Sequence, residues 1–156
     1  MIRPATSADI PTILHLVREL AAFEREPDAV TASETDLHAA LFGPRPAAEA
    51  VIAQEDDAVL GFALFFHNFS TWTGKRGLYL EDLYVTPAAR GKGIGTALLR
   101  HLAQEAVARG CARFEWSVLD WNADAIAFYR AMGAVGMEEW TIQRVTGEAL
   151  ERLARG

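Results

Sequence analysis

The chain has 156 residues, a net charge of −6 and a hydrophobic fraction of 51%, which predicts one domain with a substantial core. The acidic balance argues against a nucleic-acid partner, because no basic patch is available to neutralise a row of phosphates, and it favours a cationic substrate. No apolar run approaches the ~20 residues of a membrane span, and residues 1–4 open no signal peptide, so we expect a cytoplasmic protein with no membrane partner.

The first half of the chain predicts a strand, two helices and a hairpin. Thr6 or Ser7 can cap the first helix, and Pro11 lies in its first turn, where proline is tolerated. Apolar residues recur along this helix at helical spacing; they are Ile10, Ile13, Leu14, Val17, Leu20 and Ala21. The predicted elements are a strand at 1–5, this helix, a second helix at about 33–41, and strands at about 49–54 and 58–67 joined across Asp56-Asp57 as a hairpin.

In the second half, strands and helices alternate. Gly110 is a C-terminal cap of the first helix there, Asn122 caps the next helix, and Gly133 stops it. The predicted elements are a strand at 78–85, a helix at about 96–109, a half-buried strand at 112–118, a helix after residue 122, a strand at about 140–145 and a short helix from 147. This order predicts a mixed α/β sandwich.

The most informative segment is 78–96, LYLEDLYVTPAARGKGIGT, in which a strand leads through a glycine-rich loop into a helix. Backbone amides freed by Gly91, Gly93 and Gly95 can converge on an anion, and the start of the helix adds unpaired N–H groups and its positive dipole end. Arg90 adds a fixed positive charge. The segment therefore predicts a pyrophosphate cradle.

The order of residues in the loop separates the known phosphate motifs. A Walker loop is excluded, because neither Gly74-Lys75 nor Gly91-Lys92 is followed by Ser or Thr. A dinucleotide fingerprint fails at Thr96, where it requires Gly or Ala. Arg90, Gly93 and Gly95 form R-x-x-G-x-G, which resembles the acetyl-CoA motif of the GNAT superfamily of N-acetyltransferases.

The resemblance covers nearly the whole chain. The matching motifs are IRPAT near the start, REL followed by Glu24, W-x-G-K at 72–75, LYLEDLYV, RGKGIG, and N-x-x-A-x-x-FYR-x-x-GA at 122–134. Together they are similar to the spermidine/spermine and thialysine acetyltransferase branch of the superfamily. Two departures are Phe23, where relatives commonly have tyrosine, and the tight hairpin at Asp56-Asp57. The resemblance implies one N-acetyltransferase domain over 1–156, with a GNAT-type mixed, mostly antiparallel sheet flanked by helices.

The resemblance also implies acetyl-CoA as the acetyl donor. The positions expected to bind it are Leu83, Tyr84, Val85, Arg90, Gly91, Lys92, Gly93, Ile94, Gly95, Thr96, Asn122 and Arg130. For Asn122 the capping role would be a sufficient explanation by itself. No metal is expected, since the chain has a single cysteine, Cys111, and its four histidines show no ligand spacing.

The chemistry of amine acetylation suggests roles for the acidic residues. A primary amine with a pKa near 10.4 is neutral in only about one molecule in 2,500 at pH 7, so a proton must leave before nitrogen can attack. We assign proton removal through water to Glu81, and retention of a distant ammonium to Asp82 with help from Glu24. Adjacent residues on a regular strand face opposite ways, so Glu81 and Asp82 would point to opposite sides of the sheet. A bulge would redirect these two side chains. The family usually has such a bulge, and we expect it at Leu83-Tyr84. The alternative is that these carboxylates merely face solvent.

Two further roles come from the resemblance. Tyr129 corresponds to the general acid that protonates the leaving sulfur. The alternative is that Tyr129 is an amphipathic tyrosine that packs in the helix core. Trp72 falls in the substrate-binding motif. Catalysis is therefore expected from Tyr129 and Glu81, and acceptor binding from Glu24, Trp72, Glu81 and Asp82.

Three classes of function remain. The first is direct transfer from acetyl-CoA to a small cationic amine, such as a polyamine, diamine or thialysine-like acceptor. The second is acetylation of a protein lysine or amino terminus, for which Phe65-Phe66 and residues 69–72 would line or block a peptide groove. The third is a non-catalytic acyl-CoA-binding module, against which Tyr129 and Glu81 argue. Relatives are commonly homodimers that pair or exchange the last strand, so we expect a homodimer in which Trp140 is buried.

Overall fold

The computed structural model describes all residues, Met1 to Gly156, in two compact parts, Met1–Leu119 and Asp120–Gly156. The first part contains a five-stranded sheet in the order β1-β2-β3-β4-β5. Its strands are β1 (Ile2–Pro4), β2 (Glu49–Glu55), β3 (Ala58–Ser70), β4 (Lys75–Val85) and β5 (Arg113–Trp116). Only β4 and β5 pair in parallel. The expected mixed, mostly antiparallel sheet is confirmed.

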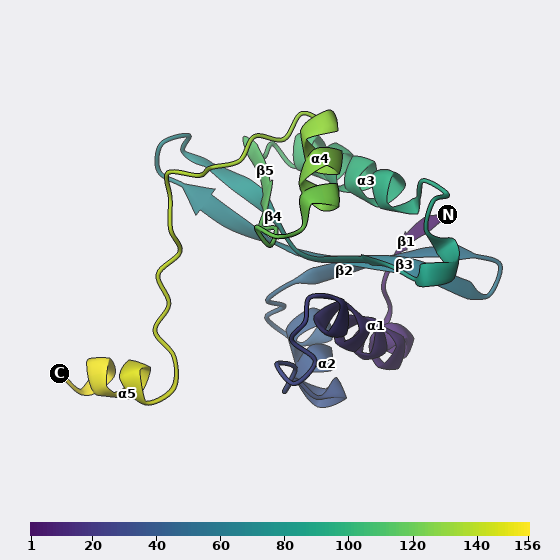
Figure 1. Cartoon of the computed structure of the whole chain (residues 1–156). Helices are drawn as coiled ribbons and strands as arrows, with labels where there is room; N and C mark the ends of the chain where they lie inside the picture. The colour runs from purple at the N-terminus through teal and green to yellow at the C-terminus, as the bar shows by residue number, and fades with distance from the viewer. The chain divides into compact units, whose positions relative to one another are not determined.

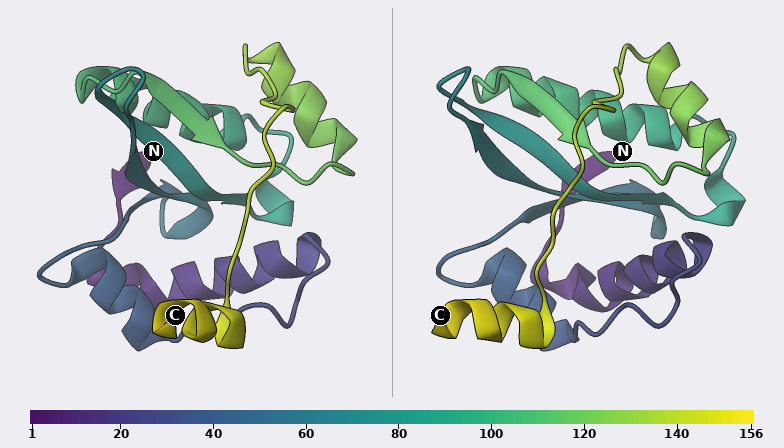
Figure 2. Two further views of the ribbon diagram at one scale, coloured as in Figure 1. Left: turned by 90° about the vertical axis from the view of Figure 1, so that its left-hand side faces the viewer. Right: turned by 60° about the vertical axis from the view of Figure 1, so that its left-hand side comes forward.

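Helices cover both faces of this sheet (Figures 1 and 2). The helices of the first part are α1 (Ile10–Phe23), α2 (Glu34–Phe42) and α3 (Ile94–Ala108), with short 3-10 turns at Ser7–Asp9 and Pro87–Ala89. On the α1 and α2 face, Ile13, Ile52 and Phe62 form a core with no exposed surface. On the α3 face, Leu98 and Leu102 are completely buried. Helices α1 and α3 turn their apolar stripes toward the sheet, as the spacing of their apolar residues predicts, and α2 adds Leu41 to the core beneath α1.

Polar contacts fix the entry to α1. The Asp9 carboxylate accepts hydrogen bonds from the Arg3 guanidinium at 2.8 and 2.9 Å and from the Thr6 backbone N–H at 2.7 Å. These donors lower the pKa of Asp9 from 3.8 to about 2, the Arg3 hydrogen bond being the largest cause. This anchor joins the first strand to the first helix.

The exit from α1 is a Schellman motif. The Glu26 N–H donates to the Ala21 carbonyl at 2.9 Å, and the Arg25 N–H donates to the Ala22 carbonyl at 3.1 Å. Arg25 takes the left-handed conformation, with φ of 65°, which usually falls to glycine or asparagine. This turn therefore carries backbone strain. It also sets the position of Glu24, which is the C-cap of α1.

The second part contains α4 (Ala123–Ala131) and α5 (Gly147–Arg155). The strand predicted at 140–145 is wrong, since residues 133–146 have no regular secondary structure. A strand needs a neighbour to bond its N–H and C=O groups, and no other strand of the chain pairs with this segment. None of the helices combines the length and apolarity that crossing a bilayer requires.

Candidate active site

The glycine-rich loop has the backbone that a phosphate cradle needs. Gly91 and Gly93 have φ of 77° and 79°, and no atom lies within 4 Å of the position that a Cβ would occupy on either. Gly93 is the N-cap of α3, and no side chain bonds the helix start there. The first N–H groups of α3 are thus left for another acceptor, which is the arrangement that favours an anion.

The sheet opens next to this loop. Pairing of β4 with β5 ends at Leu80 and Trp116, so the part of β4 from Glu81 to Val85 is bonded on one side only, by β3. The open edge includes Leu83, Tyr84 and Val85, three of the predicted cofactor-binding residues. Their backbone groups on the β5 side can bond an extended ligand.

A β-bulge lies at Glu81. Leu64 of β3 pairs with Asp82, whereas the next residue, Phe65, pairs with Leu80, so Glu81 is the extra residue. The expected position of the bulge, Leu83-Tyr84, is therefore wrong by two residues. Asp82 shares a face with Tyr84, which packs in the core beneath α1, by the ordinary alternation of a strand, and the bulge turns Leu80 to the opposite face. The strand therefore has a bulge between the two positions that flank Glu81, whereas the roles of Glu81 and Asp82 stay a prediction.

The bulge gathers negative charge on the α1 face. Burial, followed by the charges of Glu81 and Glu24, raises the pKa of Asp82 from 3.8 to about 6. Burial also raises the pKa of Glu24. Two predicted acceptor residues, Glu24 and Glu81, therefore act electrostatically on the third, Asp82. This site disfavours its own negative charge and favours a cation.

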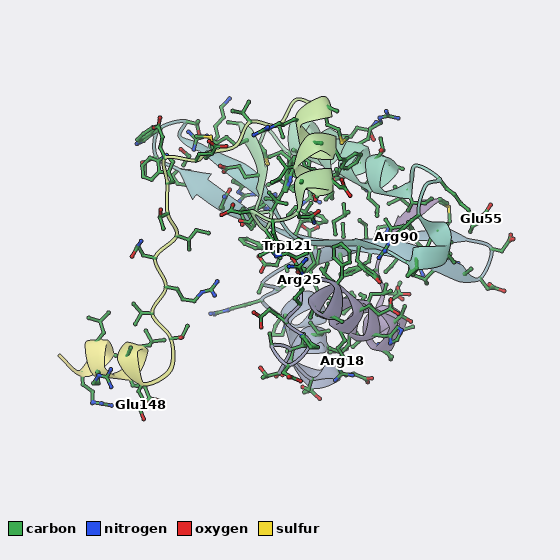
Figure 3. All side chains as sticks on the ribbon, in the orientation of Figure 1. Arg18, Arg25, Glu55, Arg90, Trp121 and Glu148 are labelled. Carbon is green, nitrogen blue, oxygen red and sulfur yellow. The ribbon has the colours of Figure 1, made fainter.

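The side chain of Arg90, labelled in Figure 3, lies over the ring of Phe23, the last residue of α1. Its guanidinium carbon lies 5.5 Å from the centre of the Phe23 ring and 5.3 Å from that of Tyr84. Its Nε donates to the Val85 carbonyl at 3.0 Å. The sequence predicts that the Arg90 charge faces a phosphate, and it gives no sign of the two rings. No local pattern links Phe23 and Arg90, because they are 67 positions apart.

Trp72 lies outside the carboxylate cluster. It belongs to the turn between β3 and β4 and is 81% exposed. Lys75, at that end of the hairpin, and Asp82 are seven positions apart on β4, a distance of roughly 23 Å along a strand. Trp72 therefore cannot meet these carboxylates within one chain.

The remaining predicted residues belong to α4, in the second part of the chain. The Asn122 side chain accepts a hydrogen bond from the Ala125 N–H at 3.2 Å, which confirms it as the helix cap. The Tyr129 ring lies 5.6 Å from that of Phe128. The Arg130 guanidinium lies 3.7 Å from the Glu138 carboxylate, and both side chains are exposed.

Comparison with known proteins identifies the family. Residues 14–134 match the Acetyltransferase (GNAT) family. The chain is 39% identical to the thialysine N-epsilon-acetyltransferase of Bos taurus, over 99% of this chain and 96% of that protein. It is 34% identical to the L-ornithine N5-acetyltransferase of Arabidopsis thaliana, over 97% of this chain and 86% of that protein. A solved integron cassette protein of V. cholerae is 32% identical with a TM-score of 0.83, covering all of this chain and 98% of the other.

The chain belongs to the GNAT family. It is an acetyl-CoA-dependent N-acetyltransferase. The residues present fit this donor, since the left-handed glycines, the uncapped start of α3 and the open edge of β4 lie in sequence along one stretch of chain. Acetyl-CoA supplies an acetyl group already activated as a thioester.

Proposed function

We propose that this GNAT enzyme acetylates a primary amine of a small cationic acceptor, such as a polyamine, diamine or thialysine-like amine. The observation that carries the proposal is the carboxylate cluster of Glu24, Glu81 and Asp82 beside the open edge of β4. A second ammonium on the acceptor would offset the negative charge of this cluster and lower the pKa of Asp82. The names of the thialysine and ornithine acetyltransferases among the relatives support a substrate of this class.

The proposed reaction is direct transfer in a ternary complex. Glu81 is exposed at the bulge, so it can take the ammonium proton through a water molecule. The free amine then forms the C–N bond as the C–S bond breaks, and Tyr129 donates its phenolic proton to the departing sulfur. The nitrogen loses its second proton, which returns to the Tyr129 phenolate through solvent. Asp82 and Glu24 hold the second ammonium of the acceptor.

The donor is proposed to lie along β4 and the loop that follows. Backbone amides from Arg90 to Thr96 hold the pyrophosphate, and the open edge from Leu83 to Val85 holds the extended arm. Asn122 and Arg130 of α4 add contacts to the arm and phosphates. In this proposal residues 1–156 act as one N-acetyltransferase domain.

The test is mass spectrometry of products from acetyl-CoA and a panel of polyamines, diamines, thialysine, ornithine and lysine-containing peptides. We expect diamines and polyamines to outperform monoamines of the same length. Glu81→Gln should lower kcat most, and Asp82→Asn should chiefly raise KM for the diamine. Glu55→Gln, an exposed carboxylate at the end of β2, is the matched control. Acetylation of peptides alone would replace the proposal with a protein acetyltransferase.

We further propose that the enzyme works as a symmetric homodimer. The second part of the chain exposes a series of large apolar side chains, which a partner would cover; they are Val135, Met137, Trp140, Ile142, Val145, Leu150 and Leu153. Strand β5 is a free edge of the sheet and can accept another strand. Light scattering should give about twice the chain mass of 17.1 kDa. A fully active monomer would rule this assembly out as the functional unit.

A further inference from the structure

One side chain connects the glycine-rich loop to the end of α1. Arg90 follows the 3-10 turn after β4, and its guanidinium lies over the rings of Phe23 and Tyr84. Its hydrogen bond to the Val85 carbonyl fixes the direction of the side chain. A planar guanidinium can stack on a ring and bond at its edge at the same time, which a lysine ammonium does not do as well.

The end of α1 needs such support. Arg25 holds a left-handed φ of 65°, a conformation that costs a non-glycine residue about 1 kcal/mol or more. Strain of this kind persists only where contacts from outside the turn maintain it. Phe23, the last residue of α1, is 47% exposed and lies under the Arg90 guanidinium.

The residue between Phe23 and Arg25 belongs to the acceptor cluster. Glu24 is the cap of α1, its N–H donates to the Leu20 carbonyl at 2.9 Å, and its charge raises the pKa of Asp82. Glu24 directly follows Phe23, so a shift of this end of α1 would move both residues. The contacts thus run from the donor loop through Arg90 and Phe23 to the acceptor carboxylates.

We propose that Arg90 is a positioning residue for the acceptor: by holding Phe23 it fixes the end of α1 and places Glu24 beside Asp82. This inference rests on the proposed function only in naming the acceptor. Its effect falls on acceptor binding, whereas a guanidinium serving the phosphates would affect binding of acetyl-CoA. Phe23 provides the ring face, so tyrosine at this position would serve equally well.

Kinetics separate the two roles. Arg90→Met should raise the KM for a diamine about fivefold at saturating acetyl-CoA, the size of one exposed cation–π contact, with kcat and the acetyl-CoA Kd changed less than about twofold. Arg90→Lys should recover part of the lost acceptor affinity, and Phe23→Tyr should change the KM little.

Phe23→Leu should match Arg90→Met. The double variant, Phe23→Leu with Arg90→Met, should have a KM no higher than either single variant. Arg100→Met, an exposed arginine of α3, is the control. A weaker acetyl-CoA Kd with an unchanged acceptor KM in Arg90→Met would overturn the proposal.

Hydrogen exchange tests the same inference without any turnover. The amides of Glu24, Arg25 and Glu26 close the end of α1. They should exchange about fivefold faster in Arg90→Met and Phe23→Leu, and at the wild-type rate in Phe23→Tyr and Arg100→Met. Unchanged exchange in Arg90→Met would show that Arg90 does not support this turn. An enzyme that acetylates none of the amines would refute the proposed function, whereas the exchange rates would still decide the role of Arg90.

Discussion

The two parts of the chain treat their apolar residues in opposite ways. In Met1–Leu119, helices on both faces of the sheet bury Phe62, Leu78 and Leu98 completely. In Asp120–Gly156, Trp140 is 68% exposed and Val135 is 81% exposed. The first part therefore has a closed hydrophobic core. The second contains Tyr129 but leaves much apolar surface uncovered, so we infer that it is completed by a partner.

The largest expected effect concerns Tyr129, the proposed general acid, which lies in the second part. Tyr129→Phe retains the ring and its contact with Phe128 but removes the phenolic proton, so kcat should fall by roughly 10² to 10⁴ if that proton limits the rate. The acetyl-CoA Kd from calorimetry should stay the same. Near-normal turnover would make Tyr129 a packing residue and would move the chemistry to the first part alone.

A matched pair of core and exposed substitutions tests the contrast directly. Phe62→Ala should cost about 3–5 kcal/mol of unfolding free energy, because Phe62 is completely buried between the sheet and α1. Trp140→Ala should cost little in a monomer and should instead weaken the dimer. Urea unfolding and light scattering measure the two effects. A large loss of monomer stability in Trp140→Ala would show that the second part has a core of its own.

These contrasts also explain which features the sequence could reveal. The helices and strands of the first part follow from apolar spacing, and Asn122 was recognisable as a cap, because both signals are local. The strand predicted at 140–145 failed because a strand depends on a neighbour that this chain does not provide. The bulge at Glu81 depends on the register between β3 and β4, and the Arg90 contact with Phe23 joins distant segments, so neither had a local signal.

The cradle in the first part can be broken without touching the core. Gly93→Val places a β-branched residue at φ of 79° in a loop with open space around it, so the cost is backbone strain rather than a clash. We expect the acetyl-CoA Kd to rise by roughly tenfold or more, since a shifted loop moves several amides at once. Calorimetry measures the change, and Gly74→Val, in the hairpin turn, is a control at a second left-handed glycine. Equal affinity in Gly93→Val and wild type would reject the cradle.

Asp82 should make the first part more stable at low pH than at high pH. Its folded pKa of about 6 exceeds the unfolded value of 3.8, so the folded state retains a proton that the unfolded state releases. The unfavourable contribution is absent below pH 4, grows between pH 4 and 6, and is complete above pH 6. Asp82→Asn should therefore raise stability by about 1–3 kcal/mol at pH 8 and hardly at all at pH 4. A Tm difference between Asp82→Asn and wild type that does not vary with pH would contradict this account.

The smallest expected effect comes from Asp9, which has the opposite sign. Its folded pKa of about 2 lies below the unfolded value of 3.8, because the Arg3 guanidinium and the Thr6 N–H stabilise the charged carboxylate. This stabilisation is complete above pH 4 and is lost as the pH falls toward 2. Since the pair is partly open to solvent, Asp9→Asn should cost about 1–2 kcal/mol at pH 7. The loss of stability in Asp9→Asn should shrink as the pH falls from 4 toward 2. The control is Asp28→Asn, which changes an exposed carboxylate after α1. Thermal unfolding of both variants across this pH range measures the loss of stability. A difference between Asp9→Asn and wild type that stays constant with pH would mean that packing, rather than the charge on Asp9, holds β1 to α1.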